Sequence, residues 1–432
     1  MISTLIDRFV ESSTFKKHVT STFLTQVGKI TLSVATAAIV AQYLGPEGKG
    51  MLALALLVPG MLGIFLSGGI EVANVYFTAS KRLDVPTLTA SSTGLAVLVT
   101  ILGFGVVIGL TAAGWVNVIV PGVPPWILLI AMLGFPTSLL NGFFSSILQG
   151  LQRIFTINSI SFLQSFVTLI LTFLFVIGWK LGLFGAVLAP LASGALSLIV
   201  FGIFLRREGG VFTPRWSYHV LRSTLFFGLR GHVGNVLQFF NYRLDMFILN
   251  YFLGPASVGI YAVSVRLTEL LWYLPNAVGF VIFPKAAASK PEEMNVFTPR
   301  VFRATLGLTA LGALGLAFVG RPVINLVFSS AFVGAFIPML VLLPGVVLLG
   351  GAKVLTNELA GRGYPHYNSL NAGLALILTV VLDLVLIPRY GVVGAALASS
   401  AAYTTIFFTA IGFYLTVSRD TKDKSPMEVS AS

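Results

Sequence analysis

Long apolar runs separated by short polar segments dominate the chain from residue 19 onward. A transmembrane helix needs about 20 mainly apolar residues to cross a hydrocarbon layer about 30 Å thick, and each run reaches about that length. We therefore expect an all-α membrane protein with twelve transmembrane helices. The runs lie at about 19–43, 50–78, 91–114, 124–149, 154–178, 182–205, 224–252, 258–284, 301–320, 333–358, 367–388 and 391–416.

Composition supports the same class and excludes several others. Of the 432 residues, 56% are hydrophobic and 10% are charged, whereas soluble domains carry about 25% charged residues. The chain has no cysteine, and its four histidines are far apart, so neither a disulfide framework nor a metal cluster is expected. Walker-type nucleotide loops and the common hydrolase motifs are missing, and the loops are too short for a catalytic domain. We expect no enzyme activity, catalytic residue, cofactor or bound metal.

The basic residues alternate between the two sides of the predicted helices. With the N-terminus placed inside, the inner loops and termini hold 18 of the 27 Lys and Arg residues, and the outer loops hold four. Cytoplasmic loops of multi-pass proteins are enriched in Lys and Arg. The bias predicts that both termini are cytoplasmic. It also attributes the net charge of +12 to membrane orientation rather than to nucleic-acid binding.

A sequence repeat divides the predicted helices into two halves. The motif LGP-x-x-x-G at 44–50 recurs 209 residues later at 253–259. Glycine ends one helix and proline starts the next, so we expect a tight hairpin at both places. Six helices return the chain to the same side, so the repeat is parallel and its two lobes enclose a central cavity. The predicted parts are a cytoplasmic or interfacial N-terminal segment (1–18), an N-lobe (19–205), a cytoplasmic linker (206–223), a C-lobe (224–416) and a cytoplasmic tail (417–432).

Several apolar helices carry a stripe of polar residues on one face. The seventh helix shows the stripe best, with Arg230, Gln238, Asn241 and Asp245 at helical spacing. An ionisable group at the membrane centre costs about 2.5–3.5 kcal/mol on insertion scales and therefore faces a cavity or a partner. Uncharged polar residues also join helices by hydrogen bonds, so the sequence leaves both roles open. Further stripe residues are Gln26 and Lys29 in the first helix, Glu71 and Asn74 in the second, Arg266, Glu269 and Asn276 in the eighth, and Lys353 in the tenth.

Five acidic residues lie within the predicted spans, namely Glu71, Asp245, Glu269, Glu358 and Asp383. The simplest interpretation of each is charge compensation of a nearby Lys or Arg. Arg266 and Glu269 are three residues apart and can pair along one helix, whereas Arg243 is directed toward another element or the outer mouth. The functional interpretation is that one acid binds a proton or cation that drives transport. Glu71, Asp245 and Glu269 are the candidates for that role.

The hairpin motif and the region of the seventh and eighth helices resemble those of Wzx-type oligosaccharide flippases. The second region runs from Arg243-x-Asp245 through 253–255 to Gly259-x-Tyr261-Ala262 and Arg266-Leu267-x-Glu269. This family belongs to the multidrug/oligosaccharidyl-lipid/polysaccharide exporter superfamily, and the resemblance covers nearly the whole chain. It implies a V-shaped transporter with a cationic lumen, alternating access, and coupling to a proton or sodium gradient.

The resemblance also implies a substrate, partners and a location. The substrate is an undecaprenyl-pyrophosphate-linked oligosaccharide, moved from the cytoplasmic to the periplasmic leaflet of the inner membrane for O-antigen, capsule or exopolysaccharide assembly. Membrane lipids and a polysaccharide polymerase are the implied partners. The basic stripe residues would contact the pyrophosphate, and the amide residues would contact the sugar. The pyrophosphate residues are Lys29, Arg230 and Arg266, followed by Arg243 and Lys353, and the sugar residues are Gln26, Asn74, Gln238, Asn241 and Asn276.

Three other functions are weighed against this one. A MATE-like exporter of drugs or metabolites shares the fold but favours an acidic or aromatic cavity. A lipid II flippase is related but typically carries two more helices. A membrane polymerase or ligase needs large outer loops with catalytic charges, which this sequence lacks.

Overall fold

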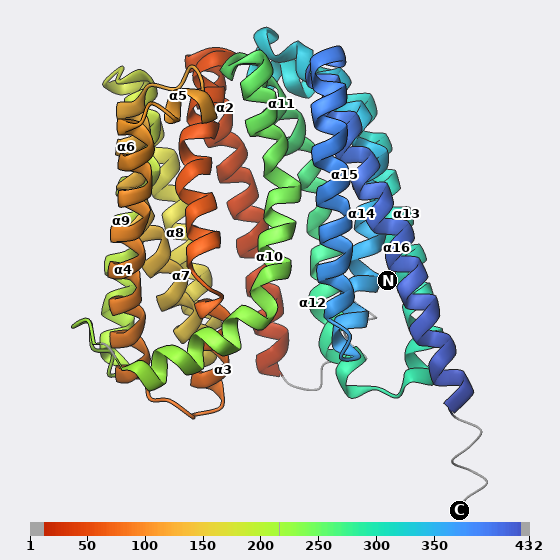
Figure 1. Ribbon diagram of the computed structural model, residues 1–432. Coiled ribbons are helices and arrows are strands. Elements are labelled where there is room, and N and C mark those ends of the chain that lie inside the picture. Colours follow the sequence, from red (N-terminus) through yellow and green to blue (C-terminus); the bar gives the residue numbers. More distant parts are fainter. Residues whose placement is uncertain (1–12, 216, 425–432) are drawn as a thin grey trace, which may run out of the picture. The chain divides into compact units, whose positions relative to one another are not determined.

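The computed structural model describes residues 13–215 and 217–424, and side chains within 25–215, 217–229 and 232–418. Residues 1–12 of the predicted N-terminal segment and 425–432 of the predicted tail lie outside the described residues. Every regular element in the described ranges is a helix (Figure 1). The expected all-α fold is confirmed.

The helices of the first half follow the predicted apolar runs. The long helix α2 (Ser13–Leu66) contains two predicted spans, because Gly45 interrupts its helical geometry with φ 66° and ψ −174°. A second interruption follows at Gly68 and Gly69, whose φ values are 58° and 74°. The remaining elements are α3 (Ile70–Ala79), α4 (Val85–Ala112), α5 (Val116–Ile119), α6 (Pro125–Met132), α7 (Gly134–Gly150), α8 (Ile154–Thr172), the π-helix η1 (Phe173–Gly178) and α9 (Gly182–Arg207).

The second half repeats the glycine–proline interruption. Helix α10 (Tyr218–Leu253) ends before Gly254, whose φ is 76° and ψ is 178°, and Pro255 begins the next helix. The predicted turn geometry is therefore present at both copies of the motif. The following elements are α11 (Pro255–Glu269), η2 (Leu270–Trp272), α12 (Tyr273–Ala288), α13 (Pro291–Val323), η3 (Ile324–Phe328), η4 (Ser330–Ala335), α14 (Phe336–Gly361), α15 (His366–Tyr390) and α16 (Val392–Lys424).

The number of long helices agrees with the predicted spans. Among the described residues, 10 helical stretches are long and apolar enough to cross a membrane. One of them, residues 25–66, is interrupted at Gly45 and so contains two helices. Helix α10 adds a further helix of 36 residues. The architecture is consistent with twelve transmembrane helices.

The helices form two compact units. The first comprises the chain up to Leu44, Ala55–Asn117 and Val123–Arg230, and the second comprises Gly45–Leu54, Val118–Gly122 and the chain from Gly231 onward. In the first unit, α4, α7 and α9 contribute to one buried apolar core. In the second unit, α14 packs against α11, α12, α13 and α16.

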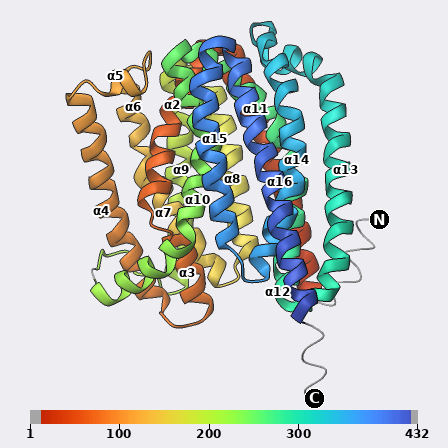
Figure 2. The same ribbon diagram turned by 45° about the vertical axis from the view of Figure 1, so that its right-hand side comes forward.

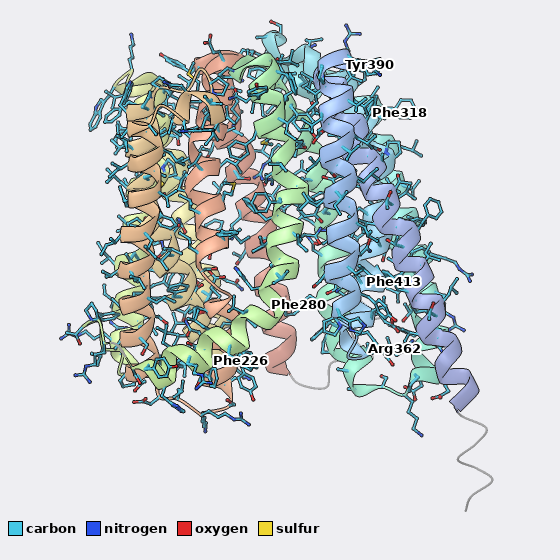
Figure 3. The ribbon with its side chains drawn as sticks, viewed as in Figure 1. Phe226, Phe280, Phe318, Arg362, Tyr390 and Phe413 are labelled. Carbon is cyan, nitrogen blue, oxygen red and sulfur yellow. The ribbon has the colours of Figure 1, made fainter. Side chains whose placement is uncertain are left out.

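Large apolar side chains on the outside of the helices suit a lipid environment. Phe280 is 71% exposed and Phe318 is 83% exposed, and Phe318 lies on the outer side of its helix bundle in Figure 3. In water such exposure would be costly, whereas lipid tails accommodate it. The exposed apolar surface therefore supports a membrane-spanning chain.

The two copies of the hairpin motif contact each other within the second unit. Gly50 lies against the backbone of Pro255 and Gly259, and Gly259 lies against the backbone of Pro46 and Gly50. A Cβ atom at either glycine would overlap a backbone oxygen, so only glycine permits this approach. The repeat therefore serves helix packing as well as turn geometry.

A buried ion pair joins three helices at one end of the second unit. Arg362 pairs with Glu358 of α14, and their side chains are 6% and 0% exposed. Arg362 also donates a hydrogen bond to Asn295 Oδ1 of α13 over 2.8 Å, and its guanidinium lies 5.8 Å from the ring centre of Tyr414 in α16 (Figure 3). This contact fixes the ends of α13, α14 and α16 to one another.

Candidate functional site

Most of the predicted charged residues gather in one polar cluster within the second unit. The cluster draws side chains from α2, α10, α11, η2, α12, α14, α15 and α16. It comprises an ion pair, a pair of buried carboxyl groups, an aromatic group with a lysine, and a pair of cations.

The ion pair connects α10 to α11. Arg243 Nη1 lies 2.9 Å from Glu269 Oε1, and the two side chains are 28% and 17% exposed. Arg243 also interacts electrostatically with Asp245, two residues further along α10. Arg243 therefore pairs with a residue of another helix, which is one of the two positions expected for it from sequence. It balances charge that would otherwise be costly inside an apolar bundle.

Asp245 is buried and fully hydrogen-bonded. Its Oδ2 accepts hydrogen bonds from Tyr261 Oη over 2.6 Å and from Ser399 Oγ over 3.1 Å. Its Oδ1 accepts a hydrogen bond from the Met246 amide over 2.8 Å. These donors come from α10, α11 and α16. They make the carboxyl group a junction of three helices.

Asp383 of α15 brings a second carboxyl group to Asp245. On the same two helices, Thr379 donates a hydrogen bond to Asn241 over 2.7 Å. Each aspartate lies four residues beyond one member of that pair, and the two carboxyl groups interact electrostatically. Asp383 is 0% exposed, and within the described part of the chain neither of its oxygens has a hydrogen-bond partner.

This carboxyl pair has a specific chemical capacity. Two carboxylates that interact electrostatically in a buried site repel each other, so such a pair favours binding of a proton or a small cation. The sequence analysis counted Asp383 among the acids but did not place it in the site. Asn241 and Thr379 precede the two aspartates at the same spacing of four, and this shared pattern was the signal available in the sequence.

An aromatic group holds Lys353 next to this region. Lys353 Nζ donates a hydrogen bond to Asn276 Oδ1 over 2.8 Å and lies 4.5 Å from the ring centre of Trp272. The Trp272 ring is 5.1 Å from that of Tyr242 and 5.7 Å from that of Tyr403. The aromatic faces stabilise the ammonium by cation–π attraction. Lys353 and Asn276, predicted for different parts of the substrate, therefore contact each other.

Two cations from different helices form the last part of the cluster. Lys49, in the second half of α2, and Arg266 of α11 are both half-buried and close enough to repel each other electrostatically. The sequence analysis missed Lys49 because it placed this residue in an outer loop. Lys49 lies one residue before Gly50 of the hairpin motif, and this position was the only sign in the sequence that it belongs to the packed helix ends. Like charges held together in this way favour binding of an anion.

The remaining predicted residues have other surroundings. Lys29 is half-buried in α2, and Gln26 is exposed on the same helix. Glu71 is exposed in the first turn of α3. Asn74 is buried and donates a hydrogen bond to Ser92 Oγ over 3.0 Å, so its amide joins α3 to α4.

Two residues of α10 complete the predicted set. The side chain of Gln238 lies near that of Tyr242, one turn further along α10. The side chain of Arg230 lies outside the described residues. The structure thus brings together Arg243, Asp245 and Glu269 with their neighbours. In the part of the chain whose side chains are described, no three His, Asp or Glu residues are grouped as metal ligands.

Comparison with known proteins assigns the chain to a family. The family described as polysaccharide biosynthesis protein matches residues 15–289. The chain belongs to this family. A Shigella flexneri protein named as an O-antigen transporter is 23% identical over 381 residues, which cover 85% of this chain and 90% of that protein. The flippase AglR of Haloferax volcanii is 28% identical over 221 residues, covering 48% of this chain and 45% of that protein.

Solved structures of known transporters share this fold. The lipid II flippase MurJ in an inward closed conformation superimposes with a TM-score of 0.74 at 16% identity, covering 93% of this chain and 90% of that one. An inward-facing MATE transporter of the MOP superfamily gives a TM-score of 0.72 at 16% identity, covering 91% and 96%. These relatives are transporters and flippases rather than enzymes. The expected family is confirmed, and the chain has the fold of these transporters.

Proposed function

We propose that the protein moves an undecaprenyl-pyrophosphate-linked oligosaccharide from the cytoplasmic to the periplasmic leaflet of the inner membrane. Both termini are cytoplasmic in this proposal, and two six-helix lobes alternate the access to a central cavity. The cations Lys29, Arg230, Arg266, Arg243 and Lys353 contact the pyrophosphate, with Lys49 added to this set. The amides Gln26, Gln238 and Asn276 face the sugar, whereas Asn74 and Asn241, also considered from sequence, are buried in hydrogen bonds with Ser92 and Thr379.

The observation that carries the proposal is the closeness of Lys49 and Arg266. Two half-buried cations lie close enough inside apolar helices to repel each other. An anionic pyrophosphate between them offsets that repulsion, whereas a cationic drug increases it. The pair therefore favours an anionic headgroup over the substrates of a drug exporter.

The test is polysaccharide export in a strain that lacks the chromosomal copy. Lys49→Ala and Arg266→Ala are expected to lower surface polymer at least tenfold, with lipid-linked oligosaccharide accumulating in the inner leaflet. Arg389→Ala is the matched control, because Arg389 is an exposed cation at the end of α15. Protein levels in the membrane are measured by immunoblot for all three variants.

Two results would count against the proposal. Normal polymer in both the Lys49 and the Arg266 variant, at normal protein levels, removes the pyrophosphate role. Hypersensitivity of the deletion strain to cationic drugs, with surface glycans unchanged, points instead to a MATE-like exporter.

We further propose that the carboxyl pair Asp245 and Asp383 binds the coupling ion, a proton or sodium. Of the acids considered from sequence, Glu269 is engaged by Arg243 and Glu71 is exposed, whereas Asp245 has a second carboxyl group beside it. The protein in proteoliposomes should flip substrate faster when a proton or sodium gradient is imposed. Asp383→Asn should remove that acceleration, and an unchanged response to both gradients would contradict this assignment.

A further inference from the structure

The first part of α10 differs in direction from the helices around it. Residues 218–229, here called the basal segment, run across the ends of α3 and α4 instead of along them (Figures 1 and 2). The basal segment belongs to the first unit together with α3, α4 and α9. A helix lying across the ends of membrane-spanning helices has the direction expected for the plane of the membrane surface.

One face of the basal segment is packed against the first unit. The Phe227 ring stacks on that of Tyr76 in α3, with 4.3 Å between ring centres. Gly228 lies against the backbone of Gly69, at the interruption between α2 and α3. Val220 and Thr224 are buried on the same face at a spacing of four. This face of the basal segment is therefore buried against the first unit.

The opposite face is exposed and apolar. Tyr218 is 78% exposed, Phe226 is 65% exposed and Leu229 is 48% exposed. Arg222 is exposed between them, so these four residues follow one another at spacings of four, four and three. Such a face is unfavourable in water. Tyrosine, phenylalanine and arginine together suit the boundary between headgroups and acyl chains.

A group of arginines surrounds this face. Arg206 and Arg207 end α9, and Arg215 lies in the connection to α10, all exposed like Arg222. The acid in the same connection, Glu208, pairs with Arg153 over 2.7 Å, so its charge is already balanced. The surface around the basal segment is therefore strongly positive. Anionic lipid headgroups attract such juxtamembrane arginines.

We propose that the outer face of the basal segment lies on the membrane surface and binds anionic phospholipids. Tyr218, Phe226 and Leu229 enter the headgroup boundary, while Arg206, Arg207, Arg215 and Arg222 hold the lipid phosphates. The inference requires that the chain spans a membrane, and it does not depend on the transported substrate.

The experiment uses the lack of cysteine in the natural sequence. Phe226→Cys in the full chain carries a single bimane fluorophore, and the purified protein is placed in phosphatidylcholine nanodiscs. The nanodiscs also contain one spin-labelled lipid, which is either phosphatidylglycerol or phosphatidylcholine. In both lipids the spin label lies near the top of the acyl chain. Both spin-labelled lipids are expected to quench the fluorophore. Spin-labelled phosphatidylglycerol should give the same degree of quenching at a severalfold lower mole fraction than spin-labelled phosphatidylcholine.

A pair of charge variants separates local lipid binding from bulk charge. Arg215→Gln with Arg222→Gln should reduce the preference for phosphatidylglycerol at least about fivefold, since each arginine contributes about that factor. Arg300→Gln with Arg303→Gln is the matched control, because both residues are exposed on α13. The control should keep the preference.

Three results overturn the inference. Absence of quenching by either lipid places residue 226 in water. Equal quenching by the two lipids removes the anionic preference. An equal loss of preference in the control pair assigns the effect to net charge. Transport of substrate is measured separately, so that a failure of the proposed function leaves this result interpretable.

Discussion

Asp245 and Asp383 occupy matching positions on α10 and α15, but only Asp245 has hydrogen-bond donors around it. Tyr261, Ser399 and the Met246 amide stabilise the negative charge of Asp245. Asp383 lacks such donors in the described part of the chain, so a negative charge on it would be less stabilised than the charge on Asp245. This asymmetry gives the two aspartates different responses to substitution.

Asp245→Asn should lower the free energy of unfolding by about 2 kcal/mol, because hydrogen bonds to a charged acceptor are weakened. Asp383→Asn should leave it unchanged or raise it by about 1 kcal/mol, because the substitution removes a buried negative charge that repels Asp245. Thermal and chemical unfolding of the purified variants in detergent compare the two. Equal destabilisation by both would show that Asp383 is negatively charged and stabilised in the native state.

The Arg243–Glu269 pair should couple across helices. Single and double replacements by methionine should give a coupling energy of about 1–3 kcal/mol, because the two side chains are largely buried. The exposed pair Arg153 and Glu208, whose side chains are 56% and 28% exposed, is the internal control and should give less than about 1 kcal/mol. Similar energies for both cycles would mean that the α10–α11 pair is screened by water.

The glycine contact should be intolerant of any side chain. Gly50→Ala and Gly259→Ala should each cost about 1–3 kcal/mol, since an added methyl group overlaps a backbone oxygen. Gly60→Ala is the matched control, because Gly60 is in the same helix α2 with no atom near its Cβ position. It should stabilise the protein by up to about 1 kcal/mol. Melting temperatures that fall equally in all three variants would argue against the contact.

The free energy of unfolding should depend on both partners of the buried Arg362–Glu358 pair at the end of α14. Arg362→Met leaves the Glu358 charge buried alone and should cost about 3–5 kcal/mol. Replacing both residues by methionine should recover most of that loss, because two packed apolar side chains need no charge balance. Unfolding in detergent measures both variants. A double variant as unstable as the single one would show that the Arg362 contact with Asn295 is the larger contribution.

The sequence predicted the helices well because each span carries its own signal. Apolar runs of membrane length and the glycine–proline turns depend only on residues close together in the chain. Gly45 and Gly254 have the positive φ angles that the turn requires. The repeat was also visible, since it needs only a comparison of the chain with itself.

The site was predicted less completely because its members come from distant helices. Asp245 was selected on α10, but its neighbour Asp383 is 138 residues away, and no periodicity connects the two helices. The sequence allowed Glu269 to pair with Arg266 along one helix or to bind a coupling ion, and in the structure Glu269 forms an ion pair with Arg243 of another helix. Lys49 was assigned to a loop because a charge near a predicted span end ordinarily lies outside it. Such partnerships are set by packing, which short sequence patterns do not contain.

The direct backbone contact of Gly50 with Gly259 also limits how α11 can tilt. No side chains separate the two backbones, so the distance between them cannot shorten. A tilt of α11 would therefore pivot at this contact. Arg266 lies seven residues beyond it, about 10 Å along the helix axis. A tilt of about 15° at this contact would move that guanidinium by roughly 3 Å, which is about the length of one hydrogen bond.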